Sequence, residues 1–249
     1  DALSRENVEK FFKTYYSPNN LTIAIAGDVD PDEVQKLAKT YFGRFQAQPQ
    51  PSVVAKVEPP QSKTKTVTVT FPSQPWYLEG YHIPALSDPD YGVYEVIAQL
   101  LSSGRTSRLY KSLVEEQQLA LSAQGFSGFP GNKYPNLMLV YALTSPNTSV
   151  DRLATALRAE IERLKTEAVA PEELEQVKTQ LKAGLLRTLD SNMGMANLLA
   201  EYQAKTGSWR NIFEELKKLE AISPQDIQRV ALKTFTEENR TIGKLLPPS

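Results

Sequence analysis

LSRENVEKFFKTYYSPNNLTI, residues 3–23, has a near copy at the other end of the chain, ISPQDIQRVALKTFTEENRTI, residues 222–242. At an offset of 219 residues (223 − 4) the two stretches align without a gap. Both have a hydroxyl N-cap, an amphipathic helix, a turn that ends in Asn and an alternating strand. An offset this long predicts the duplication of a whole domain, because short repeats have periods of about 20–50 residues. A chance match of one common helix–turn–strand unit is the alternative. The identical positions are Ser4 and Ser223, Asn20 and Asn239, Thr22 and Thr241, and Ile23 and Ile242.

If the repeat closes a domain of about that size, the first copy keeps only the end of its domain. The sequence then predicts a C-terminal remnant of a first domain at residues 1–45, a linker at 46–62 and a complete second domain at 63–249. The linker assignment rests on QAQPQPSVVAKVEPPQS, which is rich in Pro and Gln and has no periodicity. In the remnant we expect a helix, a strand at residues 20–28 and a second helix. Because the sequence starts with Asp1 rather than Met, we expect its true beginning to be missing.

The second domain combines strands with a long helical stretch. KTVTVTF and QPWYLEGYHIP are typical of two strands, which we expect to pair with each other around the Pro72–Pro75 turn. Two more strands flank PGNKYP, several amphipathic helices follow, and NRTIGKLL supplies a closing strand. Strands followed by helices and one final strand predict an α+β fold, in which a mostly antiparallel sheet packs against a helical layer.

The composition excludes several classes of protein. With 249 residues, 41% hydrophobic residues and a net charge of −1, the chain lacks the basic excess that nucleic-acid binding requires. No run reaches the ~18 apolar residues of a membrane span. Cys is absent, which excludes disulfides, thiolate catalysis and Cys-based zinc sites. We expect a soluble protein of the bacterial cytoplasm or periplasm, although the composition does not fix the compartment.

A single histidine, His82, rules out any site that requires two. It lies in the second expected strand, where side chains alternate between two faces. Trp76 and Leu78 share its face, whereas Tyr77 and Glu79 point the other way. A lone histidine in a strand is more often a polar packing residue than a ligand or a catalytic base, and we assign it the packing role.

Two stretches resemble a known family. YYSPNNLTIAIAGDVDPDEV is similar to the segment that closes the first domain of the M16 metallopeptidases, the family of pitrilysin, insulin-degrading enzyme and the mitochondrial processing peptidase. DPDYGVYEVIAQLLSSGRTSRLYKSLVEEQQLALS is similar to a block in the second domain of that family. The resemblance implies two duplicated α+β domains that are joined by a linker and close like a clamshell. This chain would be the C-terminal portion, the second half of a chamber for peptide or unfolded-protein substrates.

The resemblance also implies that the catalytic centre lies outside this sequence. The family's zinc site is an H-x-x-E-H helix in the first domain, whose two His bind the metal and whose Glu activates water. No H-x-x-E-H occurs here, so we expect no catalytic residue, no metal ligand and no cofactor in this chain, which should be inactive alone. The implied parent is a zinc-dependent endopeptidase whose N-terminal M16 domain carries the zinc.

A second departure from the family concerns substrate binding. Active members carry an Arg and a Tyr, seven residues apart in the second-domain block, and these positions are Val114 and Leu121 here. Aliphatic side chains cannot hydrogen-bond a peptide carbonyl as Arg and Tyr do. The resemblance therefore implies a heterodimer with an M16 subunit that supplies the Arg and the Tyr. The alternatives are a non-catalytic structural or interaction subunit and a free-standing peptide-binding module.

The loop SSGRTSR at residues 102–108 is a candidate substrate contact. It enters a helix, and N–H groups at a helix start can bind peptide carbonyls or carboxylates, here at Ser103, Gly104 and Arg105. The matching loop of the processing peptidase is longer and glycine-rich, whereas this one keeps a single glycine. A plain turn before a helix is therefore the favoured interpretation.

Overall fold

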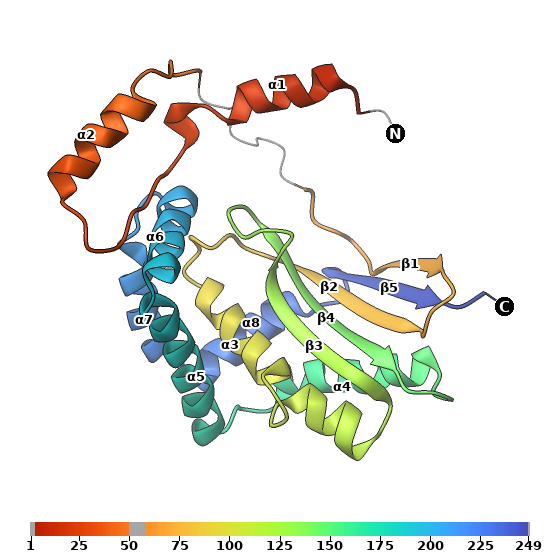
Figure 1. Cartoon of the computed structure of the whole chain (residues 1–249). Helices are drawn as coiled ribbons and strands as arrows, with labels where there is room; N and C mark the ends of the chain where they lie inside the picture. The colour runs from red at the N-terminus through yellow and green to blue at the C-terminus, as the bar shows by residue number, and fades with distance from the viewer. Residues whose placement is uncertain (1–2, 50–57, 249) are drawn as a thin grey trace. The chain divides into compact units, whose positions relative to one another are not determined.

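The computed structural model describes residues 3–49 and 58–248 (Figure 1). The chain divides into two compact units, each built from two separate stretches of sequence. The predicted linker at residues 46–62 lies partly outside the described residues, and the predicted domain boundaries stay predictions. Unit 1 consists of Asp1–Pro59 and Leu186–Arg210, and unit 2 consists of Pro60–Leu185 and Asn211–Ser249.

Unit 2 contains a five-stranded sheet with the strand order β1-β5-β2-β4-β3 (Figure 1). Strands β1 and β5 run parallel and the other neighbours run antiparallel, which confirms the predicted mostly antiparallel sheet. The predicted α+β fold class is likewise confirmed. The strands are β1 (Lys65–Thr70), β2 (Trp76–Ile83), β3 (Ala120–Phe129), β4 (Asn136–Thr144) and β5 (Arg240–Leu246).

The predicted pairing of the first two strands is wrong, because β5 lies between β1 and β2. Thr241 of β5 is in register with Lys65 of β1 and with Gly80 of β2. After β1, the Phe71 N–H donates to the Leu246 carbonyl at the end of the inserted strand, at 2.8 Å. A hairpin pairs neighbours in the sequence, whereas β5 comes from the far end of the chain, and no local pattern indicates its insertion.

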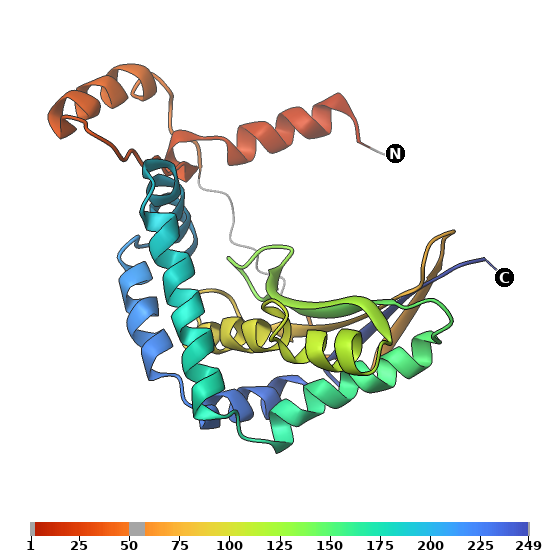
Figure 2. The same ribbon diagram turned by 60° about the horizontal axis from the view of Figure 1, so that its bottom comes forward.

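Helices α3, α4 and α8 pack against one face of this sheet (Figure 2). Their apolar stripes follow the helical period, so that Leu153, Leu157 and Ile161 of α4 are buried together, as their spacing predicts. The helices of unit 2 are α3 (Tyr91–Ser102), the π-helical η2 (Tyr110–Glu116), α4 (Val150–Thr166), α5 (Pro171–Leu189, whose last turn belongs to unit 1), α7 (Asn211–Ala221) and α8 (Pro224–Thr234).

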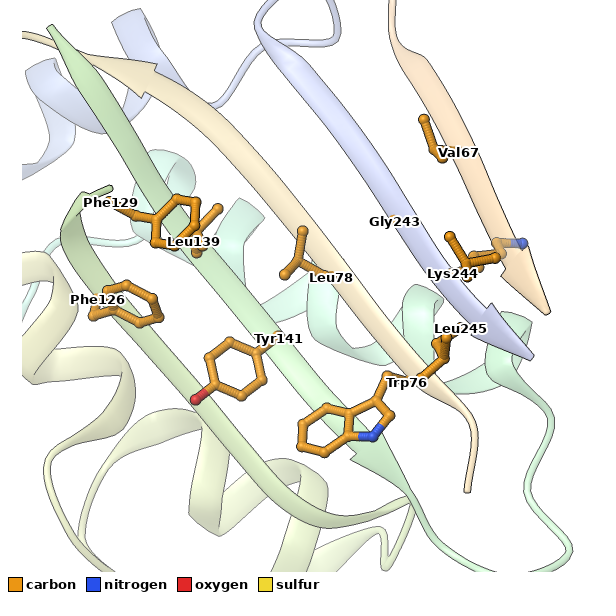
Figure 3. A pocket seen from close by; sticks show the side chains of 11 residues that line it. Val67, Trp76, Leu78, Phe126, Phe129, Leu139, Tyr141, Gly243, Lys244 and Leu245 are labelled. Carbon is orange, nitrogen blue, oxygen red and sulfur yellow. The ribbon is translucent and has the colours of Figure 1, made fainter. Parts of the chain in front are cut away.

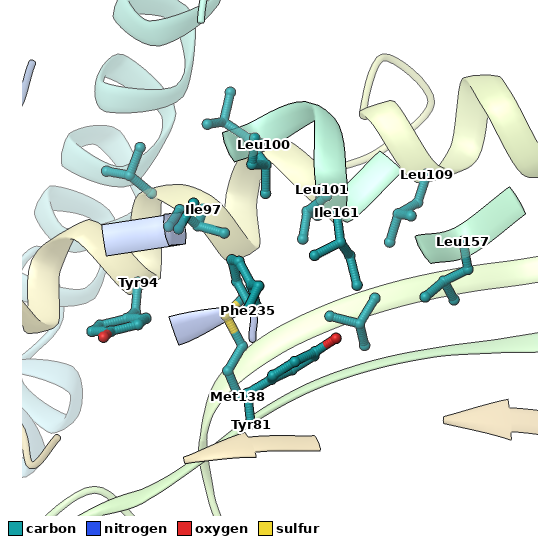
Figure 4. Packing of buried hydrophobic residues seen from close by; sticks show 14 of the residues in the cluster. Tyr81, Tyr94, Ile97, Leu100, Leu101, Leu109, Met138, Leu157, Ile161 and Phe235 are labelled. Carbon is teal, nitrogen blue, oxygen red and sulfur yellow. The ribbon is translucent and has the colours of Figure 1, made fainter. Parts of the chain in front are cut away.

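The core of unit 2 lies between these helices and the sheet (Figure 4). Tyr81 of β2 packs edge-on against Phe235, which follows α8, with a ring-centroid distance of 4.9 Å. Met138 of β4 and Ile97 of α3 are fully buried in the same cluster. Burial of one such side chain contributes about 1.5–3 kcal/mol, so this layer stabilises unit 2.

A buried carboxylate, Glu79, lies on the helix side of β2. Tyr77 donates a hydrogen bond to its Oε1 at 2.5 Å, and Tyr81 donates to its Oε2. Arg158 of α4 forms an ion pair with it at 3.0 Å. Burial and the neighbouring carboxylate raise the pKa of both tyrosine hydroxyls above their usual value. Because these donors satisfy a charge that would otherwise be costly to bury, the cluster links β2 to α4.

Both helices that the sequence predicts for the remnant are present in unit 1, so these two predictions are confirmed. The Ser4 Oγ accepts a hydrogen bond from the Asn7 N–H at 3.2 Å, as an N-cap does. Asp30 caps the second helix by accepting from the N–H groups of Asp32 and Glu33. The elements of unit 1 are α1 (Arg5–Tyr15), the short 3₁₀ helix η1 (Pro18–Asn20), α2 (Pro31–Phe42) and α6 (Asn192–Thr206).

The predicted strand at residues 20–28 is wrong for this structure, in which residues 21–26 are not part of a strand. Extended backbone becomes a strand only when its N–H and C=O groups pair with a neighbouring strand. The counterpart β5 lies between β1 and β2, whereas the described residues of unit 1 contain no strand that could pair with residues 21–26.

Candidate functional site

The sheet face opposite α3, α4 and α8 carries an apolar groove of about 590 Å³ (Figure 3). Leu78, Leu139 and Gly243 come from three neighbouring strands and line it together. Ligand pockets commonly have volumes of ~300–1,000 Å³, so the groove can hold several side chains of a ligand. Aromatic residues of β2, β3 and β4 also line it: Trp76, Phe126, Phe129 and Tyr141.

Strand alternation places these side chains on the open face. In β2, the half-buried Trp76 and Leu78 flank the fully buried Tyr77. Leu78 is in register with Tyr141 of β4 and with Gly243 of β5, so residues of three strands meet on this face. An antiparallel sheet normally presents polar residues to water, and an apolar patch on the open face therefore indicates a binding surface.

Four aromatic rings form a chain in the groove. Their centroid distances are 5.7 Å for Trp76 and Tyr141, 6.1 Å for Tyr141 and Phe126, and 6.3 Å for Phe126 and Phe129. The Tyr141 hydroxyl donates to the Gln124 Oε1 at 2.6 Å, which fixes the ring. Aromatic side chains present a large apolar area at a low cost in side-chain entropy, because they have few rotatable bonds.

Gly243 leaves space in the groove between β1 and β2. A Cβ at this position would lie 3.5 Å from the Leu78 side chain, an ordinary van der Waals distance. A larger side chain would therefore occupy the groove without a clash at its Cβ. Beyond Gly243, the exposed Val67 and Val69 of β1 line the groove.

The predicted contact loop lies at the end of α3 and does not line the groove. The Ser103 Oγ accepts from Gln99 at 2.7 Å and donates to Gln180 at 3.3 Å. Gly104 has a φ of +71°, in the left-handed region that favours glycine, and Arg105 is exposed. These contacts are those of a turn, and substrate binding by Ser103, Gly104 and Arg105 stays a prediction.

Val114 and Leu121, the family's Arg and Tyr positions, also lie outside the groove lining. Val114 in η2 is partly buried against the hydrophobic core. Leu121 is exposed in β3, where the strand register shifts between Ala120 and Ser122. The structure thus packs Val114 against the core and leaves Leu121 at the surface. The heterodimer implied by their replacement stays a prediction.

The side chains of this chain do not fit the family's zinc site. The family's helix requires two histidines and a glutamate, whereas His82 is the single histidine here. Its Nδ1 lies 3.2 Å from the Asn239 Oδ1, in the packing position that the sequence predicts. Across residues 3–49 and 58–248, no group of three His, Cys, Asp or Glu side chains could hold a metal ion.

The groove was not predicted from the sequence, because its lining is mostly apolar and contains no polar motif. The signal lies in β4, where Leu137, Leu139 and Tyr141 alternate with the buried Met138 and Val140, so that both faces of the strand are apolar. Such a run is typical of a strand covered on both sides. In a sheet with helices on one face, such an apolar run indicates that a binding partner covers the other face.

Comparison with known proteins identifies the family. The family profile described as the peptidase M16 inactive domain matches residues 2–181. The chain belongs to this family. The M16 resemblance predicted from the sequence is therefore confirmed. None of the described helices is long and apolar enough to cross a membrane.

Relatives of this M16 chain include named proteases. Zinc protease PqqE of Helicobacter pylori is 26% identical over 97% of the chain and 55% of its own length. A probable mitochondrial-processing peptidase subunit beta of Schizosaccharomyces pombe is 26% identical over 98% of the chain and 55% of its own length. The M16 chain thus spans about half the length of these curated relatives.

Solved structures have the same fold. The crystal structure of a protease from Helicobacter pylori superposes with a TM-score of 0.88 at 25% identity, over 99% of the M16 chain and 60% of that protein. A peptidase M16 inactive domain from Pseudomonas fluorescens superposes with a TM-score of 0.83 at 18% identity, over 100% of the chain and 58% of that protein. At the lower identity the likeness concerns the fold alone.

Proposed function

We propose that this chain is the non-catalytic, substrate-binding portion of an M16 zinc peptidase, and that its apolar groove holds the side chains of an extended peptide. The groove on the open sheet face is the observation that carries the proposal (Figure 3). In this proposal the chain forms the second half of the peptidase chamber. An N-terminal M16 domain of the same parent forms the first half.

The spacing of the aromatic rings favours an extended ligand. Alternate side chains of an extended peptide lie about 6.6 Å apart, because each residue advances by ~3.3 Å. The ring centroids in the groove are separated by similar distances, from 5.7 to 6.3 Å. A peptide with an apolar residue at every second position would thus place one side chain near each ring. The preferred substrate is therefore an unfolded segment rich in aliphatic or aromatic residues.

Hydrolysis is assigned to the rest of the parent. The groove is lined by apolar side chains and Lys244, and it contains no histidine or carboxylate that could act as a base. Zinc would be bound by the N-terminal domain. The Arg and Tyr that are replaced by Val114 and Leu121 would come from a partner M16 subunit.

Peptide binding to the purified chain tests this function. The probe is a fluorescein-labelled peptide of about ten residues, in which Leu and Phe alternate with Ser and Lys, and the readout is fluorescence anisotropy. Leu78→Glu places a charge in the groove and should weaken binding about tenfold or more. The matched control is Leu232→Glu, which alters an exposed leucine of α8 outside the groove and should bind normally.

A second variant separates binding from folding. Gly243→Leu fills the groove with an apolar side chain and should also weaken binding while the circular dichroism spectrum stays unchanged. Equal binding by the wild type, Leu78→Glu and Gly243→Leu would refute the groove as the site. The chain alone should not cleave the peptide, and chelator-sensitive cleavage by it would contradict the assignment of hydrolysis to the missing portion.

A further inference from the structure

The two outer edges of the sheet in unit 2 differ in regularity. β1 and β3 are the outer strands, so each has one side without a neighbouring strand in the described part of the chain (Figure 1). The register of β3 with β4 shifts between Ala120 and Ser122 and again between Phe126 and Phe129. Such irregularities protect an edge from pairing with another chain. β1 instead keeps one register with β5 from end to end.

β1 also lacks the other features that protect an edge strand. Its sequence, KTVTVT, contains no proline, no glycine and no acidic residue, and its one charge lies at its first residue, Lys65. All six residues are exposed. Val67 and Val69 line the groove and are 56% and 52% exposed, so a further strand beside β1 would cover apolar surface. Threonine and valine are strong strand formers, and β1 therefore has the composition of a strand that pairs on both sides.

The hydrogen bond that follows β1 shows which backbone groups point outward. The Phe71 N–H donates to the Leu246 carbonyl of β5. The backbone groups of successive residues in a strand point to alternate sides, so every second residue before Phe71 also bonds β5. The N–H and C=O groups of the other residues of β1, Thr66, Thr68 and Thr70, therefore point away from the sheet. Among the described residues, no backbone hydrogen bond involves these outward groups.

We propose that the β1 edge is a self-association surface, at which β1 of a second copy of this chain pairs antiparallel around a two-fold axis at Thr68. In this register Thr68 faces its own equivalent, and Thr66 faces Thr70 of the second copy. It is the register in which all three outward residues pair with one another, and each such pair exchanges two backbone hydrogen bonds. The arrangement joins two five-stranded sheets into one continuous sheet.

The side chains in this register favour a second copy as the occupant. Threonine meets threonine on one face and Val67 meets Val69 on the other, and both kinds of cross-strand pair are stabilising. Lys65 lies opposite Phe71 rather than opposite the equivalent lysine, so no like charges meet. The net charge of −1 also gives little repulsion between the copies. Because each copy uses its one β1 edge, the assembly closes as a dimer.

This pairing would also extend the apolar groove. Val67 and Val69 form the β1 side of the groove, and in the dimer the same two residues of the second copy would lie directly beside them (Figure 3). Each groove would then continue into the other across the two-fold axis. Binding of a longer apolar peptide along both grooves rests on the proposed function, whereas the pairing of the two strands does not.

Disulfide cross-linking of the 249-residue chain tests the register. The chain has no cysteine, so an introduced thiol is the only one in each copy. In Thr68→Cys the two Cα atoms at the axis should lie about 5.5 Å apart, within the range of a disulfide. Mild oxidation should therefore convert most of Thr68→Cys to a covalent dimer. Thr66→Cys alone should give at least about tenfold less dimer, because the two equivalent Cα atoms would be about 13 Å apart.

A mixture of two variants supplies the complementary cross-link. Thr66→Cys and Thr70→Cys should form a mixed dimer as readily as Thr68→Cys does, although neither should cross-link to itself, because these two positions face each other across the axis. Equal cross-linking of all three single variants would indicate random collision and would overturn the proposed register.

Sedimentation equilibrium measures the reversible dimer. An interface of one strand pair is small, so we expect a dissociation constant of about 10–100 µM. Thr68→Lys places two ammonium groups opposite each other and should weaken association about tenfold or more. Thr68→Val keeps the strand propensity without a charge and should still dimerise. The matched control Leu121→Lys adds the same charge to an exposed residue of β3, at the opposite edge, and should dimerise like the wild type.

The possible results separate the β1 dimer from the proposed function. A wild-type chain that stays monomeric up to about 300 µM would overturn the dimer, as would association that Thr68→Lys does not weaken. A monomeric chain that still binds the labelled peptide would keep the groove as the peptide site. Cross-linking through Thr68→Cys in a chain that does not bind the peptide would instead keep the β1 interface and refute the groove.

Discussion

The two copies of the helix–turn–Asn segment differ in their surroundings rather than in their own geometry. α8, Asn239 and β5 belong to the packed layer of unit 2, whereas α1, Asn20 and the side chains of Leu21, Ile23 and Ile25 are exposed. The N-cap hydrogen bonds are 3.2 Å long in both copies. Local sequence is therefore sufficient for the helix and its ends, whereas the strand depends on a partner far away in the sequence.

The largest expected difference between the two copies is in the unfolding free energy that is lost when a charge is placed on the apolar face of the helix. Val230→Asp buries a carboxylate beside the α3 and α4 helices and should lower the free energy of unfolding by about 4 kcal/mol or more. The equivalent Phe11→Asp places its charge in water and should change the free energy of unfolding by less than about 0.5 kcal/mol. Urea unfolding followed by circular dichroism measures both.

This pair of variants tests whether the α1 face is less buried than the α8 face. If Phe11→Asp is as costly as Val230→Asp in the 249-residue chain, the α1 face is already covered and the two copies are alike.

The helices were predictable because their signals are local. Ser4, Asp30 and Ser223 cap helices in the structure as the sequence indicates. The sheet was predictable only in part, since the place of β5 between β1 and β2 depends on contacts between distant residues. The groove was not predicted, because it arises from the register of separate strands rather than from any one of them.

A proline in the segment that follows each helix should give the next largest difference in stability between the two copies. Thr241 lies between Gly80 of β2 and Lys65 of β1, so Thr241→Pro places a proline in the middle of the sheet and should cost about 3 kcal/mol. The equivalent Thr22→Pro lies in unpaired extended backbone and should be close to neutral. Thermal melts of the two variants measure the effect. A large cost for Thr22→Pro would show that residues 21–26 are already paired in solution.

The smallest expected difference concerns an ion pair on the helix surface. Arg229 of α8 donates to both Asp90 carboxylate oxygens, at 3.0 and 2.9 Å, and these bonds lower the Asp90 pKa below its usual value of 3.8. Its counterpart in α1 is Lys10, and the α3 region that carries Asp90 has no equivalent in the described part of unit 1. Arg229→Ala should therefore lower the free energy of unfolding by up to about 1 kcal/mol at neutral pH, because the ion pair is partly exposed. Lys10→Ala should not change it measurably.

The dependence on pH follows from the direction of the Asp90 shift. A carboxyl whose pKa is lowered on folding stabilises the fold fully above its unfolded pKa, and this contribution disappears as the pH falls through the folded pKa. The stability difference between wild type and Arg229→Ala should thus be constant above about pH 5 and shrink below the usual Asp pKa of 3.8. Urea titrations from acid to neutral pH measure it. A difference that persists unchanged into strong acid would assign the effect of Arg229 to packing of its aliphatic stem rather than to its charge.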